Sequence, residues 1–269
     1  MKFFFKSKTY GSSIIISLFI LISCNNEKYR RPVENPLTII KNFTTFWNYW
    51  NEYVKLGQDY ISLKQNGNII SKDVFLKKLS TGSYLPLKLI TKYESDCYKL
   101  YSIPNTTDPY IRTTIAAYGS RYYHYSKMEG KPLPIFHIKS LNNKVYTNKN
   151  CENKIVVINT WFIHCSACVA EMPALNKLVD SLRDKNKIIF LSLALDNKMN
   201  LKDFLQKTDF KYAVVPNMGS YIRNNLNLKL FPTHIIVNKK GEIENVTDDY
   251  KQMEYMLNKY INKCYSSNL

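Results

Sequence analysis

The chain has 269 residues, of which 45% are hydrophobic and 14% aromatic, and this apolar content excludes an intrinsically disordered polypeptide. Eight glycines and ten prolines exclude collagen-like and low-complexity proteins, and the presence of only one long apolar stretch excludes a multispan transporter. The net charge is +17, but the lysines are scattered among asparagines, so we expect a solvated basic surface and no nucleic-acid partner.

The first 24 residues have the three-part layout of a secretory signal. Lysines precede an apolar stretch at 14–22, which is shorter than the roughly 20 residues that a membrane-spanning helix needs. Leu21-Ile22-Ser23-Cys24 resembles the lipobox of bacterial lipoproteins, so we expect a signal peptide over 1–24 and a lipid on Cys24. An uncleaved anchor is the alternative. Both place the folded part outside the cytoplasm, on the periplasmic side of a bacterial membrane, where disulfides persist.

A polar linker over 25–36 leads into a region over 37–130 that we expect to be mostly helical. Apolar residues from Phe43 to Val54 recur at helical spacing, and a hairpin follows around Asn66-Gly67. Ser71 is placed to cap a helix through Leu79, and Asp108 to cap a longer helix that ends before Gly130. The region carries no chemical motif, and a partner-binding role for it is one alternative.

The remaining residues, 131–265, alternate between strand-like and helix-like segments, which predicts an α/β domain with parallel strands. A hairpin is expected over 136–146, and two strands are expected to meet at Lys240-Gly241. The complete order is βαβ and then ββα. The expected segments are strands at 154–162, 187–195 and 212–215, and helices at 167–185, 201–206, 220–225 and the C-terminus.

The segment Cys165-Ser166-Ala167-Cys168 falls where a buried strand gives way to a helix. A thiol at a helix N-terminus meets unsatisfied N–H groups and the positive end of the helix dipole, which stabilise the thiolate. The spacing lets the second thiol resolve a mixed disulfide formed by the first. A CxxC pair also occurs in zinc sites, for which His164 and His234 are the available partners here, and in ordinary disulfides.

The segment from Trp161 to Pro173 resembles the active site of TlpA/ResA-type thiol-disulfide oxidoreductases, which have the thioredoxin fold. Phe231-Pro232-Thr233 before a strand and a Lys-Gly turn after it extend the resemblance over 132–263. The resemblance implies a central mixed sheet flanked by helices, here preceded by the smaller N-terminal region. It also implies that Cys165 attacks the substrate and that Cys168, the buried cysteine, resolves the adduct.

Further site residues follow from the same resemblance. Pro232 is expected to be a cis-proline, and together with Trp161, Phe231 and Thr233 it is expected to bind substrate. Glu171 is expected to exchange protons with the dithiol, with a solvated glutamate as the alternative. Asn159 stands where thioredoxin has a buried aspartate, which favours Glu171 as the proton carrier. His164 departs from the tryptophan that often precedes the first cysteine; it either favours the thiolate or points to solvent.

These features predict a membrane-anchored extracytoplasmic thiol-disulfide oxidoreductase that reduces protein disulfides, with no cofactor and no metal. An upstream thiol electron donor is needed to reduce the dithiol again. The alternatives are a copper-binding chaperone of the same fold and a peroxidase, although Thr160 lies five residues before Cys165 and does not match the peroxiredoxin spacing. The pairing of Cys97, Cys151 and Cys264 is left open.

Overall fold

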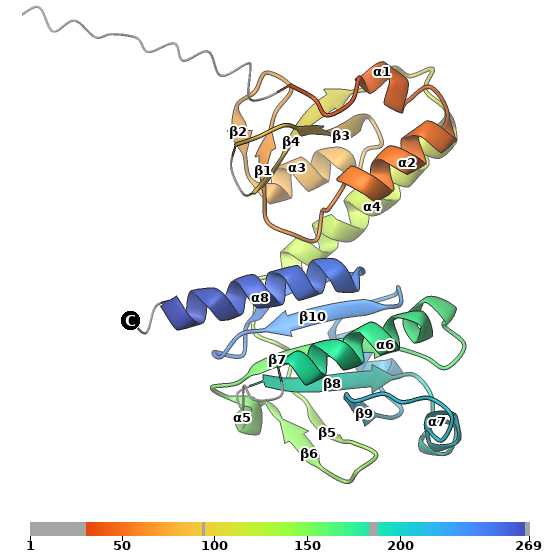
Figure 1. Cartoon of the computed structure of the whole chain (residues 1–269), viewed down its shortest axis with the longest axis vertical. Helices are drawn as coiled ribbons and strands as arrows, with labels where there is room; N and C mark the ends of the chain where they lie inside the picture. The colour runs from red at the N-terminus through yellow and green to blue at the C-terminus, as the bar shows by residue number, and fades with distance from the viewer. Residues whose placement is uncertain (1–30, 93–94, 183–187, 267–269) are drawn as a thin grey trace, which may run out of the picture.

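The computed structural model describes residues 31–92, 95–182 and 188–266, and it shows two parts stacked along the long axis of the molecule (Figure 1). The expected signal peptide and Cys24 lie outside these residues. Over the described ranges, no helix combines the length and the apolar character that a membrane crossing requires.

The N-terminal part contains helices packed on a four-stranded sheet of order β2-β1-β4-β3. The predicted hairpin and the three predicted helices are present, and Ser71 and Asp108 cap their helices through side-chain hydrogen bonds to Val74 N and Tyr110 N. The helices are α1 (Pro36–Ile39), α2 (Phe43–Tyr53), α3 (Lys72–Leu79) and α4 (Pro109–Met128), and the strands are β1 (Tyr60–Leu63), β2 (Ile69–Ile70), β3 (Tyr84–Leu89) and β4 (Asp96–Ser102).

Helices hold most of the regular structure of this part, but the strands β3 and β4 were not predicted. Pro86 lies within β3 and lacks the N–H that a central strand must donate. The structure tolerates it because β3 is the edge strand of the sheet: it pairs along its length with β4, and its outer side meets only an isolated bridge between Pro32 and Leu89 in the described residues. The sheet therefore extends the predicted hairpin by two strands that the sequence pattern conceals.

The C-terminal part is built on a five-stranded sheet of order β11-β10-β7-β8-β9, in which β7, β8 and β9 are parallel and β10 and β11 are antiparallel. The predicted order of strands and helices is confirmed. The elements are β5 (His137–Lys139), β6 (Val145–Thr147), α5 (Asn148–Cys151), β7 (Ile155–Trp161), α6 (Ser166–Ser181), β8 (Ile188–Ala194), α7 (Lys198–Leu205), β9 (Ala213–Val215), a π-helical turn (Tyr221–Asn225), β10 (Thr233–Val237), β11 (Ile243–Thr247) and α8 (Tyr250–Ser266).

Both faces of the five-stranded sheet are covered, and every residue of the central strand β7 is buried. Alternate residues such as Ile155 and Val157 pack against α6 and α8. The residues between them, Val156 and Ile158, face the opposite side and share a core with α4. Buried strands of this kind read as continuous apolar runs, which is why β7 was predicted from sequence.

The helix α4 connects the two parts of the molecule. Its C-terminal half carries Tyr122 and Tyr125 into the core on one face of the five-stranded sheet. Arg121 and Tyr122 also bind the carboxylate of Asp248, just after β11. Because apolar packing and charged hydrogen bonds both cross the junction, the N-terminal part supports the C-terminal sheet directly.

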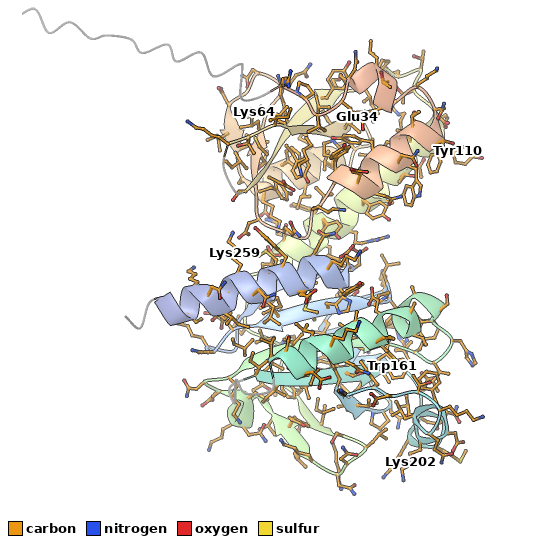
Figure 2. All side chains as sticks on the ribbon, viewed as in Figure 1. Glu34, Lys64, Tyr110, Trp161, Lys202 and Lys259 are labelled. Atoms are coloured by element: carbon orange, nitrogen blue, oxygen red, sulfur yellow. A yellow bond between two sulfur atoms is a disulfide. The ribbon has the colours of Figure 1, made fainter. Side chains whose placement is uncertain are left out.

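The basic residues are spread over the surface, as the scattered lysines predicted. Lys64, Lys202 and Lys259 lie at distant points of the two parts (Figure 2). Several lysines form ion pairs with neighbouring acids, among them Lys88 with Asp96 (2.7 Å). Exposed pairs of this kind contribute little to stability, so the charge mainly gives a solvated surface.

Candidate active site

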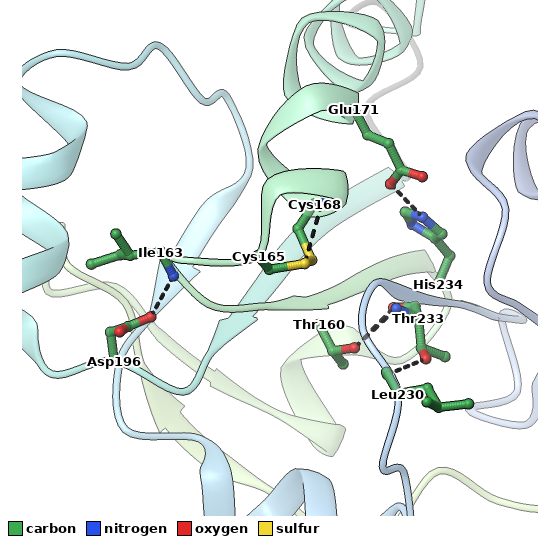
Figure 3. Close-up of a disulfide and its surroundings, with 9 residues drawn as sticks. All are labelled: Thr160, Ile163, Cys165, Cys168, Glu171, Asp196, Leu230, Thr233 and His234. Atoms are coloured by element: carbon green, nitrogen blue, oxygen red, sulfur yellow. Dashed lines mark hydrogen bonds and ion pairs between the residues drawn. A yellow bond between two sulfur atoms is a disulfide. The ribbon is translucent and has the colours of Figure 1, made fainter.

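Cys165 and Cys168 form a disulfide at the N-terminus of α6, directly after the turn that follows β7 (Figure 3). The two sulfurs are 1.98 Å apart and the two Cα atoms 5.3 Å apart. Cys165 is the N-cap residue of the helix, and the backbone N–H of Cys168 donates to its Sγ (3.2 Å). When the bond is reduced, the same N–H and the positive end of the helix dipole stabilise a thiolate on Cys165.

The two cysteines differ in exposure. In this oxidised form Cys165 is 8% exposed and Cys168 is 1% exposed. The resemblance implied an exposed attacking cysteine, and Cys165 is more covered than that, because its sulfur is bonded to Cys168 and packs with its neighbours. Cys165 is nevertheless the more exposed residue of the pair, so we expect a substrate to meet it first.

The turn before Cys165 is held by the neighbouring parallel strand. The backbone N–H of Ile163 donates to Asp196 Oδ2 (2.8 Å), and Asp196 follows the end of β8 (Figure 3). His164, the next residue, is exposed and lines a surface hollow together with Asp196 and Phe204. The structure therefore places His164 toward solvent, and Asp196 is a supporting residue that the motif itself did not indicate.

The peptide bond between Phe231 and Pro232 is cis. The ring of Phe231 packs edge-on against Phe162, with centroids 5.6 Å apart, so the proline loop lies beside the turn that carries the dithiol. Cis peptide bonds are uncommon even before proline, and this one faces the CxxC turn as the resemblance implied.

Thr233 fixes the proline loop from inside the sheet. Its N–H donates to Thr160 Oγ1 (3.2 Å), and Thr160 Oγ1 in turn donates to the Thr233 carbonyl (3.2 Å). The Thr233 hydroxyl donates to the carbonyl of Leu230 (2.8 Å) and lies 3.3 Å from the hydroxyl of Tyr125 on α4. Burial raises the pKa of Tyr125 to about 12, although the contact with Thr233 partly offsets the shift. The proline loop is thus braced by the long helix of the N-terminal part.

Glu171 lies one turn after Cys168 on α6, and its Oε2 is 3.0 Å from Nε2 of His234 on β10 (Figure 3). The side chain of Glu171 is 15% exposed and that of His234 is completely buried. Glu171 is therefore turned into the protein, which favours the proton-exchanging role over that of a solvated glutamate. The histidine partner was missed in this role, because the sequence suggested His234 only as a metal ligand.

His234 belongs to a row of polar side chains that crosses the sheet beneath α6. Asn159 on β7 pairs with His234 on one side and with Ser192 on β8 on the other. All three are almost completely buried. Within the described part of the chain, His234 Nδ1, Asn159 Oδ1 and Ser192 Oγ have no hydrogen-bond partner. Such atoms are rare in protein interiors, and they occur here next to the dithiol.

With this geometry in place, comparisons with known proteins give the family. The profile of the "AhpC/TSA family" matches residues 129–246. The thiol-disulfide oxidoreductase ResA of Bacillus thuringiensis is 30% identical over 118 residues, which are 44% of this chain and 68% of ResA. The chain belongs to the thioredoxin-like AhpC/TSA family. The predicted fold and the predicted class of thiol-disulfide oxidoreductase are thereby confirmed at the level of the family.

Two further similarities also cover about half of this chain. The thioredoxin-like protein YneN of Bacillus subtilis is 27% identical over 146 residues, 51% of this chain and 85% of YneN. The solution structure of a thiol:disulfide interchange protein from a Bacteroides species has 20% identity and a TM-score of 0.45, covering 50% of this chain and 90% of that one. About half of this chain thus has no counterpart in these relatives.

Two residues that we expected to bind substrate are enclosed in the protein core. Trp161 is completely buried, and its ring packs on Phe204 and Phe210 with centroids 5.6 and 5.8 Å away. Thr233 is also completely buried. For these two side chains the prediction is wrong, because proximity to the motif in sequence does not show which way a strand residue points. Trp161 is the last residue of β7, a strand that is buried along its whole length. The hydroxyl of Thr233 points toward Tyr125 on α4.

The structure also bears on the residues considered for other chemistries. Among the described residues, no group of three or more His, Cys, Asp or Glu side chains is arranged to hold a metal ion. Thr160, the threonine considered for a peroxidase, is buried and its hydroxyl bonds to the backbone of Thr233. Of the other cysteines, Cys97 and Cys151 are buried, and Cys264 is partly exposed.

Proposed function

We propose that this protein is a membrane-anchored extracytoplasmic thiol-disulfide oxidoreductase that reduces disulfides in other proteins. The observation that carries the proposal is the Cys165–Cys168 pair at the N-terminus of α6, next to the cis-Pro232 loop. Membership of the family that includes the thiol-disulfide oxidoreductase ResA supports the class of reaction.

The reaction begins with the reduced dithiol. The Cys165 thiolate attacks a sulfur of the substrate disulfide, a mixed disulfide forms, and the other substrate sulfur leaves as a thiolate that takes a proton from solvent. Cys168 then loses its proton to Glu171 and attacks Cys165 Sγ. The bond between Cys165 and the substrate breaks, the Cys165–Cys168 bond forms, and the second substrate sulfur leaves and is protonated. Two electrons pass to the substrate, and an upstream thiol protein must return them.

Substrate contact falls to the surface around this pair. Phe231 and Pro232 form the loop beside the dithiol, and the partly exposed ring of Phe231 offers an apolar contact. An extended segment of the substrate that lies along this loop would bring its disulfide to Cys165. Pro232 is itself buried, so we assign the side-chain contact with substrate to Phe231, and the cis bond before Pro232 to turning the loop backbone toward the substrate.

The proposal is tested by trapping substrates in cells. Cys168→Ala leaves Cys165 able to form the mixed disulfide but removes the resolving sulfur, so substrate proteins should accumulate as adducts that thiol reductants release. Cys264→Ser, which changes a cysteine of α8 outside the CxxC segment, should trap nothing, and Cys165→Ala/Cys168→Ala should also trap nothing. If Cys168→Ala gives no reducible adducts, or if the double variant gives the same ones, the proposed reaction is contradicted.

We further propose that the chain is held on the membrane through a lipid on Cys24. The support is the sequence at 14–24, with an apolar stretch followed directly by the lipobox-like Leu21-Ile22-Ser23-Cys24. Cys24→Ala should move the protein from the membrane fraction to the soluble extracytoplasmic fraction, and the intact mass of the wild-type protein should include acyl chains on residue 24. A wild-type protein without acyl mass would contradict the anchor while leaving the redox proposal in place.

A further inference from the structure

The contact between His234 and Glu171 joins two elements that the motif does not connect. Glu171 comes from α6, three residues after Cys168, and His234 comes from β10, two residues after cis-Pro232. Their side chains meet at 3.0 Å in a place where His234 has no exposed surface (Figure 3). The proline loop and the dithiol helix are thus linked through one polar contact.

His234 differs from the other ionisable groups near Glu171 in that it can carry a positive charge. The ionisable groups near Glu171 on the neighbouring elements are the dithiol of the CxxC segment, Tyr212 before β9 and Glu254 of α8, and none of these can carry a positive charge. The lysines of α6 and α8 are exposed to solvent: Lys177, Lys251, Lys259 and Lys263. Burial raises the pKa of Tyr212, and the charges of Glu171 and Glu254 raise it further, so this hydroxyl stays neutral. His234 is the group in this set that can neutralise a carboxylate at Glu171.

The step in which Cys168 attacks Cys165 needs a group that stabilises the carboxylate of Glu171. Cys168 is 1% exposed, so bulk water is poorly placed to take its proton. A buried carboxylate that accepts the proton must first exist in its charged form, which burial disfavours and a hydrogen-bond donor favours. The row partners Asn159 and Ser192 are neutral, and Nδ1 of His234 has no hydrogen-bond partner among the described residues, so the contact with Glu171 is the one hydrogen bond of this ring in that part of the chain.

We infer that His234 is a positioning residue for the resolving half of the reaction: its Nε2 holds Glu171 toward Cys168 and keeps the carboxylate ready to accept the proton. The inference rests on the proposed dithiol reaction. In the step concerned, the proton moves from Cys168 Sγ to the Glu171 carboxylate, and the electron pair left on Cys168 Sγ forms the bond to Cys165 Sγ. The bond between Cys165 and the substrate breaks, and the departing sulfur takes the electron pair. Attack by Cys165 on the substrate does not involve His234.

A small aromatic disulfide, 5,5′-dithiobis(2-nitrobenzoate), separates the two steps in one experiment. Attack by Cys165 on the reduced protein releases one coloured thiolate, and resolution by Cys168 releases the second. His234→Gln should leave the first phase unchanged and slow the second by about tenfold, because general acid–base groups contribute at least this much when they are correctly placed. The pH at which the second phase reaches half of its plateau should move upward. Ile236→Val, two residues further on the same face of β10, should change neither phase.

Two further measurements complete the test. Glu171→Gln should slow the same phase, and the double variant should be no slower than Glu171→Gln alone, because the two side chains act as one unit. In the wild-type protein, the imidazole resonances of His234 should change their titration when the disulfide is reduced. An unchanged second phase in His234→Gln, or a ring that titrates identically in both redox forms, would overturn the inference. Loss of the first phase in the wild type would instead overturn the dithiol reaction itself.

Discussion

The two faces of the five-stranded sheet are both buried, but they differ in how completely their buried polar side chains are hydrogen-bonded. On the face toward α4, Thr160, Thr233 and Tyr125 bond to one another and to the backbone. On the face toward α6, His234, Asn159 and Ser192 each keep an atom that has no partner among the described residues. An unsatisfied buried polar atom costs about 1–3 kcal/mol. The unsatisfied polar atoms on the α6 face therefore lower the free energy of unfolding, whereas the satisfied packing on the α4 face raises it.

The difference between the faces shows that the N-terminal part stabilises the C-terminal sheet. Its helix α4 completes the core on the satisfied face and touches Thr233 behind the proline loop. The row of His234, Asn159 and Ser192 lies on the other face, beside the dithiol. Adjacent residues of β8 point to opposite faces, so the difference can be measured with variants that are neighbours in sequence.

The largest effect is expected at Leu191, which is 1% exposed and packs on the α4 face. Leu191→Ala should lower the free energy of unfolding by about 2–5 kcal/mol, because it removes buried methyl groups and leaves a cavity. Urea denaturation of the oxidised protein measures this change. The rate of the first reaction of the dithiol, measured below the unfolding transition, should stay within about twofold of wild type. A loss below 1 kcal/mol would contradict the assignment of stability to this face.

An effect of opposite sign is expected at the next residue. Ser192 is completely buried on the α6 face, and its hydroxyl has no partner within the described ranges. Ser192→Ala should raise the free energy of unfolding by about 1 kcal/mol, because it removes a buried hydroxyl that forms no hydrogen bond. The same urea titration measures the gain. A destabilised Ser192→Ala protein would show that the hydroxyl is satisfied in solution, and the contrast between the faces would fail at this position.

The smallest effect is expected at Tyr125. Tyr125→Phe removes the contact with the hydroxyl of Thr233 and should cost about 0.5–1.5 kcal/mol at pH 7. Burial raises the pKa of Tyr125 from its ordinary value of 10.0 to about 12 in the folded protein. Its contribution is therefore complete below pH 10 and is lost as the pH rises from 10 to 12.

The difference between the wild type and Tyr125→Phe isolates this group from the other buried tyrosines. The variant should lose less stability than the wild type between pH 10 and pH 12, as followed by urea denaturation at several pH values. Equal losses in the two proteins would mean that Tyr125 ionises as easily when folded as when unfolded, and that the core between α4 and the sheet does not enclose its hydroxyl.

The sequence predicted the C-terminal part well because its signals are local. The apolar run of β7 and the CxxC segment after it each depend on neighbouring residues, and each appears where it was expected. β3 was missed because Pro86 masks an edge strand. The first kind of feature is set by periodicity and turn chemistry, whereas the second depends on the position of a strand within a sheet.

The site was only partly predictable for a related reason. Glu171 was identified from its spacing to Cys168, but its partner His234 lies 63 residues further along the chain. One local signal was present: His234 precedes Ile235 and Ile236 in a buried strand, where a histidine needs a polar partner. Trp161 was expected to bind substrate because it belongs to the motif segment, although it also ends the apolar run of β7, every residue of which is buried.

The central claim is that Cys165 is the attacking sulfur and Cys168 the resolving one, and alkylation of the reduced wild-type protein tests it most directly. A limiting amount of iodoacetamide at pH 7, followed by peptide mapping, reports which sulfur is ionised and accessible. The structure predicts that the label appears on Cys165 first, because its Sγ receives the N–H of Cys168 at the helix N-terminus and solvent reaches it. A label that appears first on Cys168, or equally on both sulfurs, would contradict the account.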